Sequence, residues 1–270
     1  MGQQASLAPG PLQSRPTEVL PPIPDTVLEE VFFLIPGQDV VCVFRLVCQQ
    51  WKEIVDSISY WKERCRREGL KPYNDKKTAT GWCQFYILSK RRQNLIKNPK
   101  ADGGFNNWQI IRNGGDKWQT GSISSFPDGR VQKYFVTSYH SCIKSQVIDL
   151  SKEGYGPYLM DQIQPDIVIS DWYCPRDDCG SQYEICVELL NHKRKVIKQF
   201  RPNRVVFPQW NEMQWQQMTH VFRDYGPGVR FIRFTHGGQD TQFWAGWYGI
   251  RVTNSSVEIA PPGEMKPPEP

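Results

Sequence analysis

The sequence has no apolar run that approaches the ~18 residues of a membrane-spanning helix. Its first residues lack the basic segment and the apolar segment of a secretory signal peptide. Only four histidines are present, and the eight cysteines include no C-x-x-C pair and no matching histidine spacing. We therefore expect a cytoplasmic protein with reduced, buried thiols, no metal and no cofactor. Cys174 and Cys179 are five residues apart, so a disulfide or a metal half-site between them stays open.

The chain does contain enough apolar residues for a sizeable core. Of its 270 residues, 39% are hydrophobic and 13% aromatic, and domains use roughly 100–200 residues each, which predicts two domains. The net charge of +5 is unevenly distributed. Residues 1–60 hold 3 Lys/Arg and 7 Asp/Glu, residues 61–100 hold 12 and 3, and residues 101–270 hold 18 of each. The positive excess therefore lies in one stretch.

This basic stretch, from about residue 66 to 100, is predicted to be a linker with at least one helix. Trp82, Phe85 and Tyr86 lie among its Lys and Arg residues, a combination that suits single-stranded nucleic acid. Charge runs are usually solvated faces, so we expect no nucleic-acid partner. A steep salt dependence of binding would separate the two interpretations.

Residues 23–66 have the periodicity of short amphipathic helices. Thr26 and Glu29 make a T-x-x-E capping box, followed by apolar residues at three- and four-residue steps up to a Pro-Gly pair. Asp39 is expected to cap a second segment over 40–55, and a third segment follows. Some forty helical residues bury little surface alone, so the remaining apolar face predicts a partner.

Beyond about residue 100 the pattern changes to short β-branched and aromatic runs separated by Gly-Gly, Pro-Gly and Asn-Gly turns. The predicted strands are YFVTSY (134–139), DIVISDWY (166–173), YEICVELL (183–190), KVIKQF (195–200), MTHVFRDY (218–225), VRFIRFTH (229–236) and RVTNSSVEI (251–259). Because no long helices separate these runs, we expect an antiparallel, jelly-roll-like β-sandwich.

Two sets of motifs resemble those of a known family. Residues 23–65 resemble an F-box, with an opening Ile-Pro, the mid-motif Pro36, RLVCQQW at 45–51 and a closing YWKERC. The second half resembles the F-box-associated domain of the sugar-recognising F-box proteins. The matching runs are NLIKNP (94–99), NGGDKW (113–118), KYFVTSY (133–139), QVIDL (146–150), PDIVISDW (165–172) and YGPGVRFIRFTHGGQDTQFWAGWYGIRVTNSS (225–256).

The resemblance implies a multidomain chain with a small helical domain, a helical linker and an antiparallel β-sandwich. The expected divisions are a disordered arm (1–20), the F-box (21–67), the basic helical linker (68–92), the F-box-associated sugar-binding sandwich (93–260) and a disordered tail (261–270).

The resemblance also implies a function. The F-box would bind Skp1 and, through it, the cullin scaffold of an SCF ubiquitin ligase. The associated domain would bind the chitobiose core of N-linked high-mannose glycans on misfolded glycoproteins, which are then ubiquitinated for ER-associated degradation. Such a receptor is not an enzyme, because it contributes only proximity between target and conjugating enzyme.

Residues in both domains match the family's functional positions. On the F-box, those expected to face Skp1 or to support that face are Pro24, Leu28, Val31, Ile35, Pro36, Leu46, Val47 and Trp51. For Val31 and Val47, packing between the helices alone is the alternative.

In the sandwich, the matching carbohydrate-binding positions are Tyr139, Asp178, Phe243 and Trp244. Aromatic faces pack on the apolar face of a pyranose, and a carboxylate accepts hydrogen bonds from sugar hydroxyl or amide groups. Tyr139 and Phe243 could instead be ordinary sheet aromatics, and Asp177 could replace Asp178 at the ligand. We expect Trp247 to lie in the core.

The sequence departs from the family's strongest sugar binder at one tripeptide. That member has Tyr-Trp-Lys where this chain has Phe243-Trp244-Ala245, which removes a hydroxyl and an ammonium that could each hydrogen-bond a glycan. The closest alternative keeps the ligase role, and the sandwich then recognises a non-glycosylated protein surface.

An enzyme would need paired carboxylates, as in glycoside hydrolases, and Asp166, Asp171, Asp177 and Asp178 are close in sequence. Each lies beside a turn or strand end, where Asp is common for capping reasons, so we expect no hydrolase. The start Met1-Gly2-x-x-x-Ser6 fits the pattern for N-myristoylation of Gly2. One acyl chain would give weak, reversible attachment to the cytosolic face of membranes.

Overall fold

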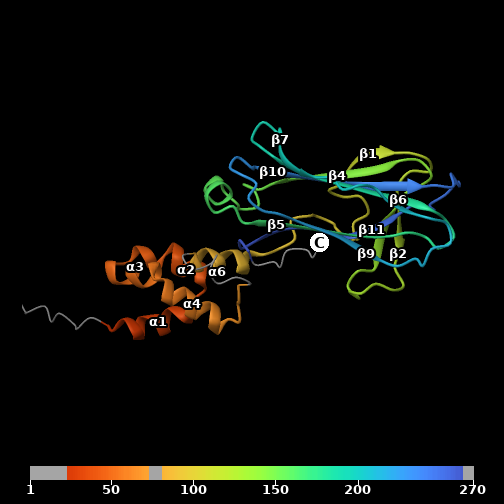
Figure 1. Cartoon of the computed structure of the whole chain (residues 1–270). Coiled ribbons are helices and arrows are strands. Elements are labelled where there is room, and N and C mark those ends of the chain that lie inside the picture. The colour runs from red at the N-terminus through yellow and green to blue at the C-terminus, as the bar shows by residue number, and fades with distance from the viewer. Residues whose placement is uncertain (1–22, 73–80, 264–270) are drawn as a thin grey trace, which may run out of the picture. The chain divides into compact units, whose positions relative to one another are not determined.

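The computed structural model describes residues 23–72 and 81–263 (Figure 1). The predicted N-terminal arm, the proposed acylation site Gly2 and nearly all of the predicted tail lie outside the described residues. Within the described part, no helix is long and apolar enough to span a bilayer. The chain divides into two compact units, 1–60 and 61–270.

The first unit consists of short helices around an aromatic centre. Its elements are α1 (Asp25–Phe33), α2 (Gly37–Cys42), the 3-10 turn η1 (Phe44–Leu46), α3 (Gln49–Asp56) and the start of α4 (Ile58–Arg67). The side chain of Phe32 is fully buried, and its ring centroid lies 5.1 Å from that of Phe44 and 5.0 Å from that of Trp51. Edge-on ring contacts of this kind compensate for the small size of the core.

The predicted capping box is wrong. α1 begins at Asp25 directly after Pro24, so Thr26 is already helical and no side chain caps the helix. A cap residue must instead be extended, so that its side chain can accept from the next turn. The helix start is held from elsewhere, because Gln50 Nε2 donates to Asp25 Oδ1 and to the carbonyl of Ile23, both at 2.8 Å.

The single helical segment predicted over 40–55 is also wrong, because it is broken into α2, η1 and α3. Asp39 lies inside α2 and does not cap it, since α2 starts at Gly37. Cys48 is extended (φ −157°, ψ 172°), and α3 starts after it. The break brings the ring centroids of Phe44 and Trp51 to 5.0 Å from each other and both rings onto Phe32, whereas residues seven apart in one straight helix are about 10.5 Å apart along its axis.

The second unit is dominated by two antiparallel sheets, which confirms the predicted fold class (Figure 1). One sheet has the order β1-β4-β10-β6-β7, with β8 also pairing with β6, and the other has the order β2-β3-β11-β5-β9. The strands are β1 (Gln109–Asn113), β2 (Gln119–Ser122), β3 (Lys133–Val136), β4 (Cys142–Asp149), β5 (Asp166–Cys174), β6 (Ser181–Leu190), β7 (Val196–Phe200), β8 (Val205–Phe207), β9 (Gln216–Phe222), β10 (Phe231–Asp240) and β11 (Arg251–Ala260). A short π-helix, η2 (Leu159–Ile163), precedes β5.

Each of the seven predicted strand runs contains a strand, but four strands were not predicted. β1, β2 and β8 are short and mostly exposed, so they lack the apolar alternation that marks a strand. β4 is central, yet it carries the buried polar residues Lys144, Ser145 and Gln146. This strand is stabilised by tertiary interactions, which cannot be predicted from the local sequence pattern.

The helix predicted in the basic stretch is present as α6 (Trp82–Arg91). The rings of Trp82, Phe85 and Tyr86 are 7% exposed or less, so they cannot stack on bases. The Tyr86 hydroxyl donates to Glu68 at 2.9 Å, and Glu68 also pairs with Lys90 at 2.9 Å. Both basic and aromatic members of the stretch thus make contacts within the unit itself.

The cysteines only partly match the expectation of buried thiols. Cys42 and Cys48 are exposed, whereas Cys65, Cys142, Cys174 and Cys179 are buried. Cys174 and Cys179 are both free, so the disulfide left open between them is not formed. Within the described residues, no group of three His, Cys, Asp or Glu side chains could hold a metal ion.

A polar cluster is buried between the sheets. Lys144 Nζ lies 2.7 Å from His236 Nε2, and His236 Nδ1 lies 2.6 Å from Asp171 Oδ2. Asp171 also accepts hydrogen bonds from Tyr183 and Ser255, both at 2.7 Å. All five side chains are buried, so this chain of hydrogen bonds replaces the water that each polar group loses on folding.

Candidate functional site

Loops at one end of the sandwich hold all four predicted carbohydrate-binding residues. Tyr139 lies between β3 and β4, Asp178 between β5 and β6, and Phe243 and Trp244 between β10 and β11. The loop after β10 is the blue loop at the right-hand edge of Figure 1.

These loops are tied to one another through their backbones. The Asp240 amide donates to the carbonyl of Ser138 at 3.0 Å, and the Thr241 amide donates to that of Gly180 at 2.9 Å. Gly180 has no room for a side chain, because a Cβ there would come 2.4 Å from Thr241 Oγ1. The sequence signal for this close approach is the Cys-Gly pair that ends the loop after β5.

Tyr139 is half-buried and its position depends on a glycine. Gly115 has a φ of +60°, and a Cβ there would come 3.0 Å from the Tyr139 ring and 2.7 Å from Ser138 Oγ. Ser138 Oγ accepts from the Asp116 amide at 2.9 Å and donates to the carbonyl of Gly246 at 2.7 Å. This buried serine therefore joins three loops.

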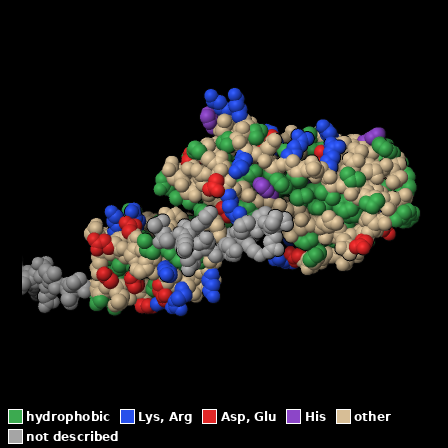
Figure 2. All heavy atoms as spheres, viewed as in Figure 1, with side chains coloured by type: hydrophobic (Ala, Val, Ile, Leu, Met, Phe, Trp, Pro, Cys, Tyr) green, Lys and Arg blue, Asp and Glu red, His purple; other side chains and the backbone are tan. Residues whose placement is uncertain are grey.

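The loop after β10 presents aromatic rings to solvent. Phe243 is 62% exposed, Trp244 is 40% exposed and Trp247 is 41% exposed, and hydrophobic side chains gather at this end of the sandwich in Figure 2. The expectation of a core position for Trp247 is wrong. Its indole N–H instead donates to the carbonyl of Lys117 at 3.2 Å, a partner available at the surface.

The rings are held at defined positions. Asp240 Oδ1 accepts from the Phe243 amide at 2.6 Å, which fixes that residue in the left-handed region at φ 57°. The edge of Trp244 meets the ring of Tyr248 with centroids 5.6 Å apart, and the Arg176 guanidinium lies 4.5 Å from the centroid of Tyr248. An ordered aromatic surface loses little side-chain entropy when it binds a ligand.

Asp178 does not stand alone at this end. Its two carboxylate oxygens each accept from Arg176 at 2.8 Å, and this hydrogen-bonded guanidinium holds the pKa of Asp178 below its usual value. Asp177 is more exposed, and its carbonyl accepts from the Asn211 amide at 3.2 Å. Asp178 is therefore ionised and oriented by Arg176, while the Asp177 carboxyl faces solvent.

The sequence reasoning missed two residues beside these loops. Arg176 was not predicted, although it adjoins the two aspartates. Trp210 is 77% exposed with a φ of +62°, and it precedes Asn211, whose side chain donates to the carbonyls of Arg176 and Pro208. The signal in the sequence was a tryptophan in a polar segment between two strands.

The four aspartates that an enzyme would need do not gather. Asp166 pairs with Arg223 at 2.9 Å, and Asp171 is buried in the core with His236. Only Asp177 and Asp178 lie at the loop end. The arrangement does not offer the two facing carboxyl groups of a glycoside hydrolase.

The first unit exposes an apolar surface. Its exposed hydrophobic residues are Ile23, Val27, Val31, Leu34, Val43, Leu46, Val47 and Ile58. Among the predicted Skp1-facing residues, Val31, Leu46 and Val47 belong to this surface, and Leu46 is 78% exposed. Exposed apolar residues in such number are typical of an interaction surface.

The other predicted Skp1-facing residues support this surface or border it. Leu28 is buried at 3% exposure, and the half-buried Trp51 packs on Phe32 and Phe44. Pro24 and Pro36 are exposed and precede α1 and α2, and Ile35 is half-buried.

Comparison with protein families gives two matches in chain order. Residues 20–63 match the F-box domain, and residues 86–259, more than half of the chain, match the F-box associated region. The chain belongs to the F-box-associated family. This F-box protein has the architecture of a substrate receptor, and its F-box implies Skp1 and the SCF complex as partners.

Curated relatives align with this chain over most of their length. The chain is 46% identical over 251 residues to F-box only protein 6 of Bos taurus, covering 91% of this chain and 95% of that protein. It is 43% identical to F-box only protein 44 of Homo sapiens, covering 89% and 96%. It is 42% identical to F-box only protein 2 of Bos taurus, covering 88% and 83%.

Among solved structures, the sandwich is similar to carbohydrate-binding modules. TmCBM61 in complex with β-1,4-galactotriose aligns with a TM-score of 0.38 at 15% identity, covering 61% of this chain and 97% of that one. A xylan-binding CBM22-1 domain from Paenibacillus barcinonensis aligns with a TM-score of 0.38 at 10% identity, covering 63% and 96%.

Proposed function

We propose that this F-box protein is the substrate-recognition subunit of an SCF ubiquitin ligase and binds the chitobiose core of N-linked high-mannose glycans. Its clients would be misfolded glycoproteins destined for ER-associated degradation, which it meets in the cytoplasm. The observation that carries the proposal is the aromatic surface at the loop end, formed by Phe243, Trp244 and the half-buried Tyr139 beside the carboxylates of Asp177 and Asp178.

The chemistry of this surface suits a sugar. The exposed ring of Trp244 offers an apolar face for the C–H face of a pyranose, and its contact with Tyr248 limits its motion. Asp178 accepts hydrogen bonds, and its orientation by Arg176 is set before any ligand arrives. A preordered surface of this kind suits a rigid disaccharide.

The receptor would act by placement. The F-box holds the chain on Skp1 and the cullin scaffold, and the sandwich holds the client, so a client lysine meets the charged conjugating enzyme at high effective concentration. No bond is made or broken by the receptor itself.

Two observations favour a second candidate, a receptor for a non-glycosylated protein surface. Ala245 is exposed and supplies no hydrogen-bonding group, and Asp178 already pairs with Arg176. Both features reduce the polar contacts left for a glycan, while the exposed rings would also suit a protein partner.

Binding of the full chain to immobilised high-mannose N-glycan, with free chitobiose as competitor, tests the proposal. We expect binding that chitobiose abolishes and that the W244A substitution lowers at least tenfold. The matched control is Y158A, because Tyr158 is 73% exposed but lies before η2. Asp161 of η2 accepts a hydrogen bond at 2.7 Å from the amide of Gly228, which lies in the loop that precedes β10. Trp244 lies in the loop that follows β10, so Tyr158 is at the opposite end of the sandwich from Trp244.

Two outcomes would contradict glycan binding. If the folded chain does not bind the glycan, the receptor for a protein surface is favoured. The same holds if Y158A weakens glycan binding as much as W244A does. In that case, partners captured on the wild-type chain and lost on W244A would replace the glycan as the ligand of this end.

A further inference from the structure

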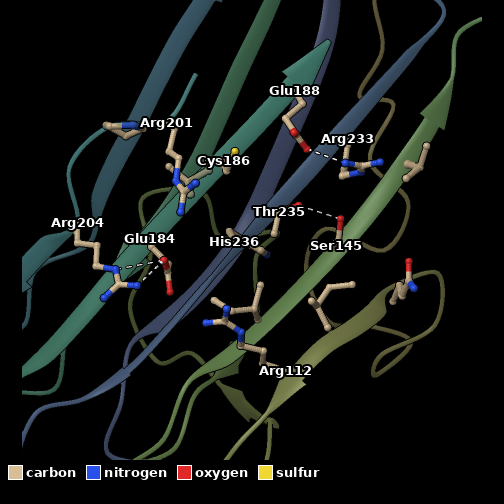
Figure 3. A pocket seen from close by; sticks show the side chains of 16 residues that line it. Arg112, Ser145, Glu184, Cys186, Glu188, Arg201, Arg204, Arg233, Thr235 and His236 are labelled. Atoms are coloured by element: carbon tan, nitrogen blue, oxygen red, sulfur yellow. Dashed lines mark hydrogen bonds and ion pairs between the residues drawn. The ribbon is translucent and has the colours of Figure 1, made fainter. Parts of the chain in front are cut away.

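A second concave surface lies on the outer face of the six-stranded sheet, away from the loop end (Figure 3). It is a groove of about 610 Å³ that crosses β1, β4, β6 and β10. Its floor includes Ile111, Ile143 and Val147, and Ile111 is 50% exposed and Val147 37% exposed. Ile111 lies on the edge strand β1 and Val147 on the neighbouring strand β4, and exposed aliphatic residues that lie together on a surface indicate a ligand that covers them.

The groove is rimmed by arginines that are only partly neutralised. Two of the four are paired, with Arg233 Nη1 at 3.0 Å from Glu188 and Arg204 Nη2 at 3.1 Å from Glu184. Arg112 and Arg201 also line the groove, and neither has a hydrogen-bonded or ion-paired partner among the described residues.

These two arginines lie on opposite sides of the groove. Arg112 belongs to β1 and Arg201 follows β7, and these strands are the two ends of the sheet order. Figure 3 shows both side chains reaching over the strands between them. The four arginines and two glutamates of the groove sum to a charge of +2.

The composition of the groove narrows the ligand class. None of its lining residues is Trp, Tyr or Phe, so it lacks the ring faces on which pyranoses pack. Glu184 and Glu188 would repel a continuous polyanion such as a nucleic acid. An aliphatic floor between separate arginines suits side chains that alternate between apolar and acidic.

We propose that this groove binds an acidic, extended polypeptide segment. In an extended chain, successive side chains point to opposite sides, so apolar residues can face Ile111 and Val147 while their neighbours reach the rim. The carboxylates of the segment pair with Arg112 and Arg201, the two guanidinium groups that the fold leaves unpaired. Planar, bidentate recognition of carboxylate is the interaction to which arginine is best suited.

The probe for the test is a peptide labelled with fluorescein on its N-terminal amine, fluorescein-Asp-Val-Asp-Leu-Asp-Val-Asp-amide, titrated with the full chain and followed by fluorescence anisotropy. We expect saturable binding that weakens with salt and falls at least tenfold in R112E/R201E, and severalfold in the milder R112Q/R201Q. The matched control is K152E/K193E, because it makes the same change in net charge at two exposed lysines outside the groove.

Several results would overturn the proposal. An Asn-for-Asp peptide that binds equally well would remove the role of the carboxylates. Equal weakening by K152E/K193E, or equal binding of inorganic polyphosphate, would mean general charge attraction only. If the arginine variants fail to fold, amide NMR of the wild-type chain tests the proposal instead. Peptide-induced chemical-shift changes confined to residues outside β1, β4, β6 and β10 would show that the peptide binds elsewhere and would overturn it. The peptide carries no glycan, so this result is independent of glycan binding at Trp244.

Discussion

At the scale of single residues, the buried cluster of Lys144, His236 and Asp171 makes the stability of the sandwich depend on pH. A lysine ammonium only donates and a carboxylate only accepts, so the neutral imidazole accepts from Lys144 at Nε2 and donates to Asp171 from Nδ1. Lys144 Nζ also lies 3.2 Å from the ring centroid of Trp108 and 3.8 Å from that of Phe135. The neutral histidine thus supplies both the acceptor and the donor that join these two groups.

We predict that H236L lowers the free energy of unfolding by about 3 kcal/mol, because leucine neither donates nor accepts a hydrogen bond and leaves the buried Lys144 and Asp171 without the imidazole between them. Thermal unfolding of the full chain at pH 7 measures this. The exposed His192 gives the matched control H192L, which should unfold like the wild type.

The same histidine predicts a pH dependence. Burial lowers the pKa of His236, so the folded protein keeps a neutral imidazole at a pH where the unfolded chain, with a pKa of about 6.5, is already protonated. The unfolded state then binds more protons, and stability falls as the pH drops from 7 to 5. A wild-type melting temperature that is flat over this range would contradict the argument, whereas a flatter profile in H236L would support it.

Position 245 gives a prediction for ligand affinity. An ammonium at this exposed position beside Trp244 would add a charged hydrogen bond to a bound glycan, and such bonds contribute about 1.5–3 kcal/mol. We therefore expect A245K to raise affinity for chitobiose at least tenfold, measured by calorimetry with the full chain. The control A245M adds a side chain of similar length without the charge. Equal gains in both variants would point to apolar contact instead.

At the scale of elements, the alternation of apolar residues predicted those strands whose position depends on that alternation. The runs at 166–173 and 183–190 match β5 and β6 closely because their apolar residues alternate. β4 was missed because Lys144, Ser145 and Gln146 find their partners on other elements, such as the carbonyl of Phe234 at 3.0 Å from Ser145 Oγ. The helix break at Cys48 was missed for a similar reason, since it serves contacts with Phe32.

The apolar surface of the first unit gives a prediction at the same scale. Leu46 in η1 is 78% exposed and Val47 after it is 55% exposed. Charged side chains at these two positions should therefore leave the packing of the first unit nearly unchanged. We expect L46D/V47D to abolish co-purification of the full chain with Skp1 while leaving its melting temperature within a few degrees of the wild type.

The contrast is with Leu28, which is buried at 3% exposure. L28A should lower the melting temperature, because it opens a cavity that costs about 2–5 kcal/mol. Retention of Skp1 by L46D/V47D would mean that Skp1 binds another face of the F-box.

At the scale of the whole molecule, the motif resemblance predicted the order of the domains and the loops that meet at one end of the sandwich. It could not predict that Trp247 lies at the surface, because the partner of its indole N–H, the carbonyl of Lys117, belongs to a different loop. The pairing of Arg176 with Asp178 is local, and it was missed because the resemblance marked only Asp178. The arginine-rimmed groove was also beyond prediction, since Arg112, Arg201, Arg204 and Arg233 are scattered along the sequence and meet only in the folded sheet.

The two proposed surfaces share one sandwich, so a single client could occupy both. Thr235 lines the groove and Asp240 starts the loop that carries Trp244, and five residues of β10 separate them by about 17 Å. A peptide of about six extended residues, at ~3.3 Å each, covers that span. Linked ligands bind more tightly than either alone because the second contact becomes intramolecular.

We therefore expect a glycopeptide that carries a high-mannose N-glycan six residues from an acidic, apolar segment to bind the full chain at least tenfold more tightly than the free glycan. R112E/R201E should reduce its affinity to that of the glycan alone, and W244A to that of the peptide alone. Shortening the spacer to one residue should remove the gain, because the segment then cannot reach the groove. Surface plasmon resonance with the immobilised chain measures each of these affinities, and a gain that survives the short spacer would show that the two surfaces are not bridged by one ligand.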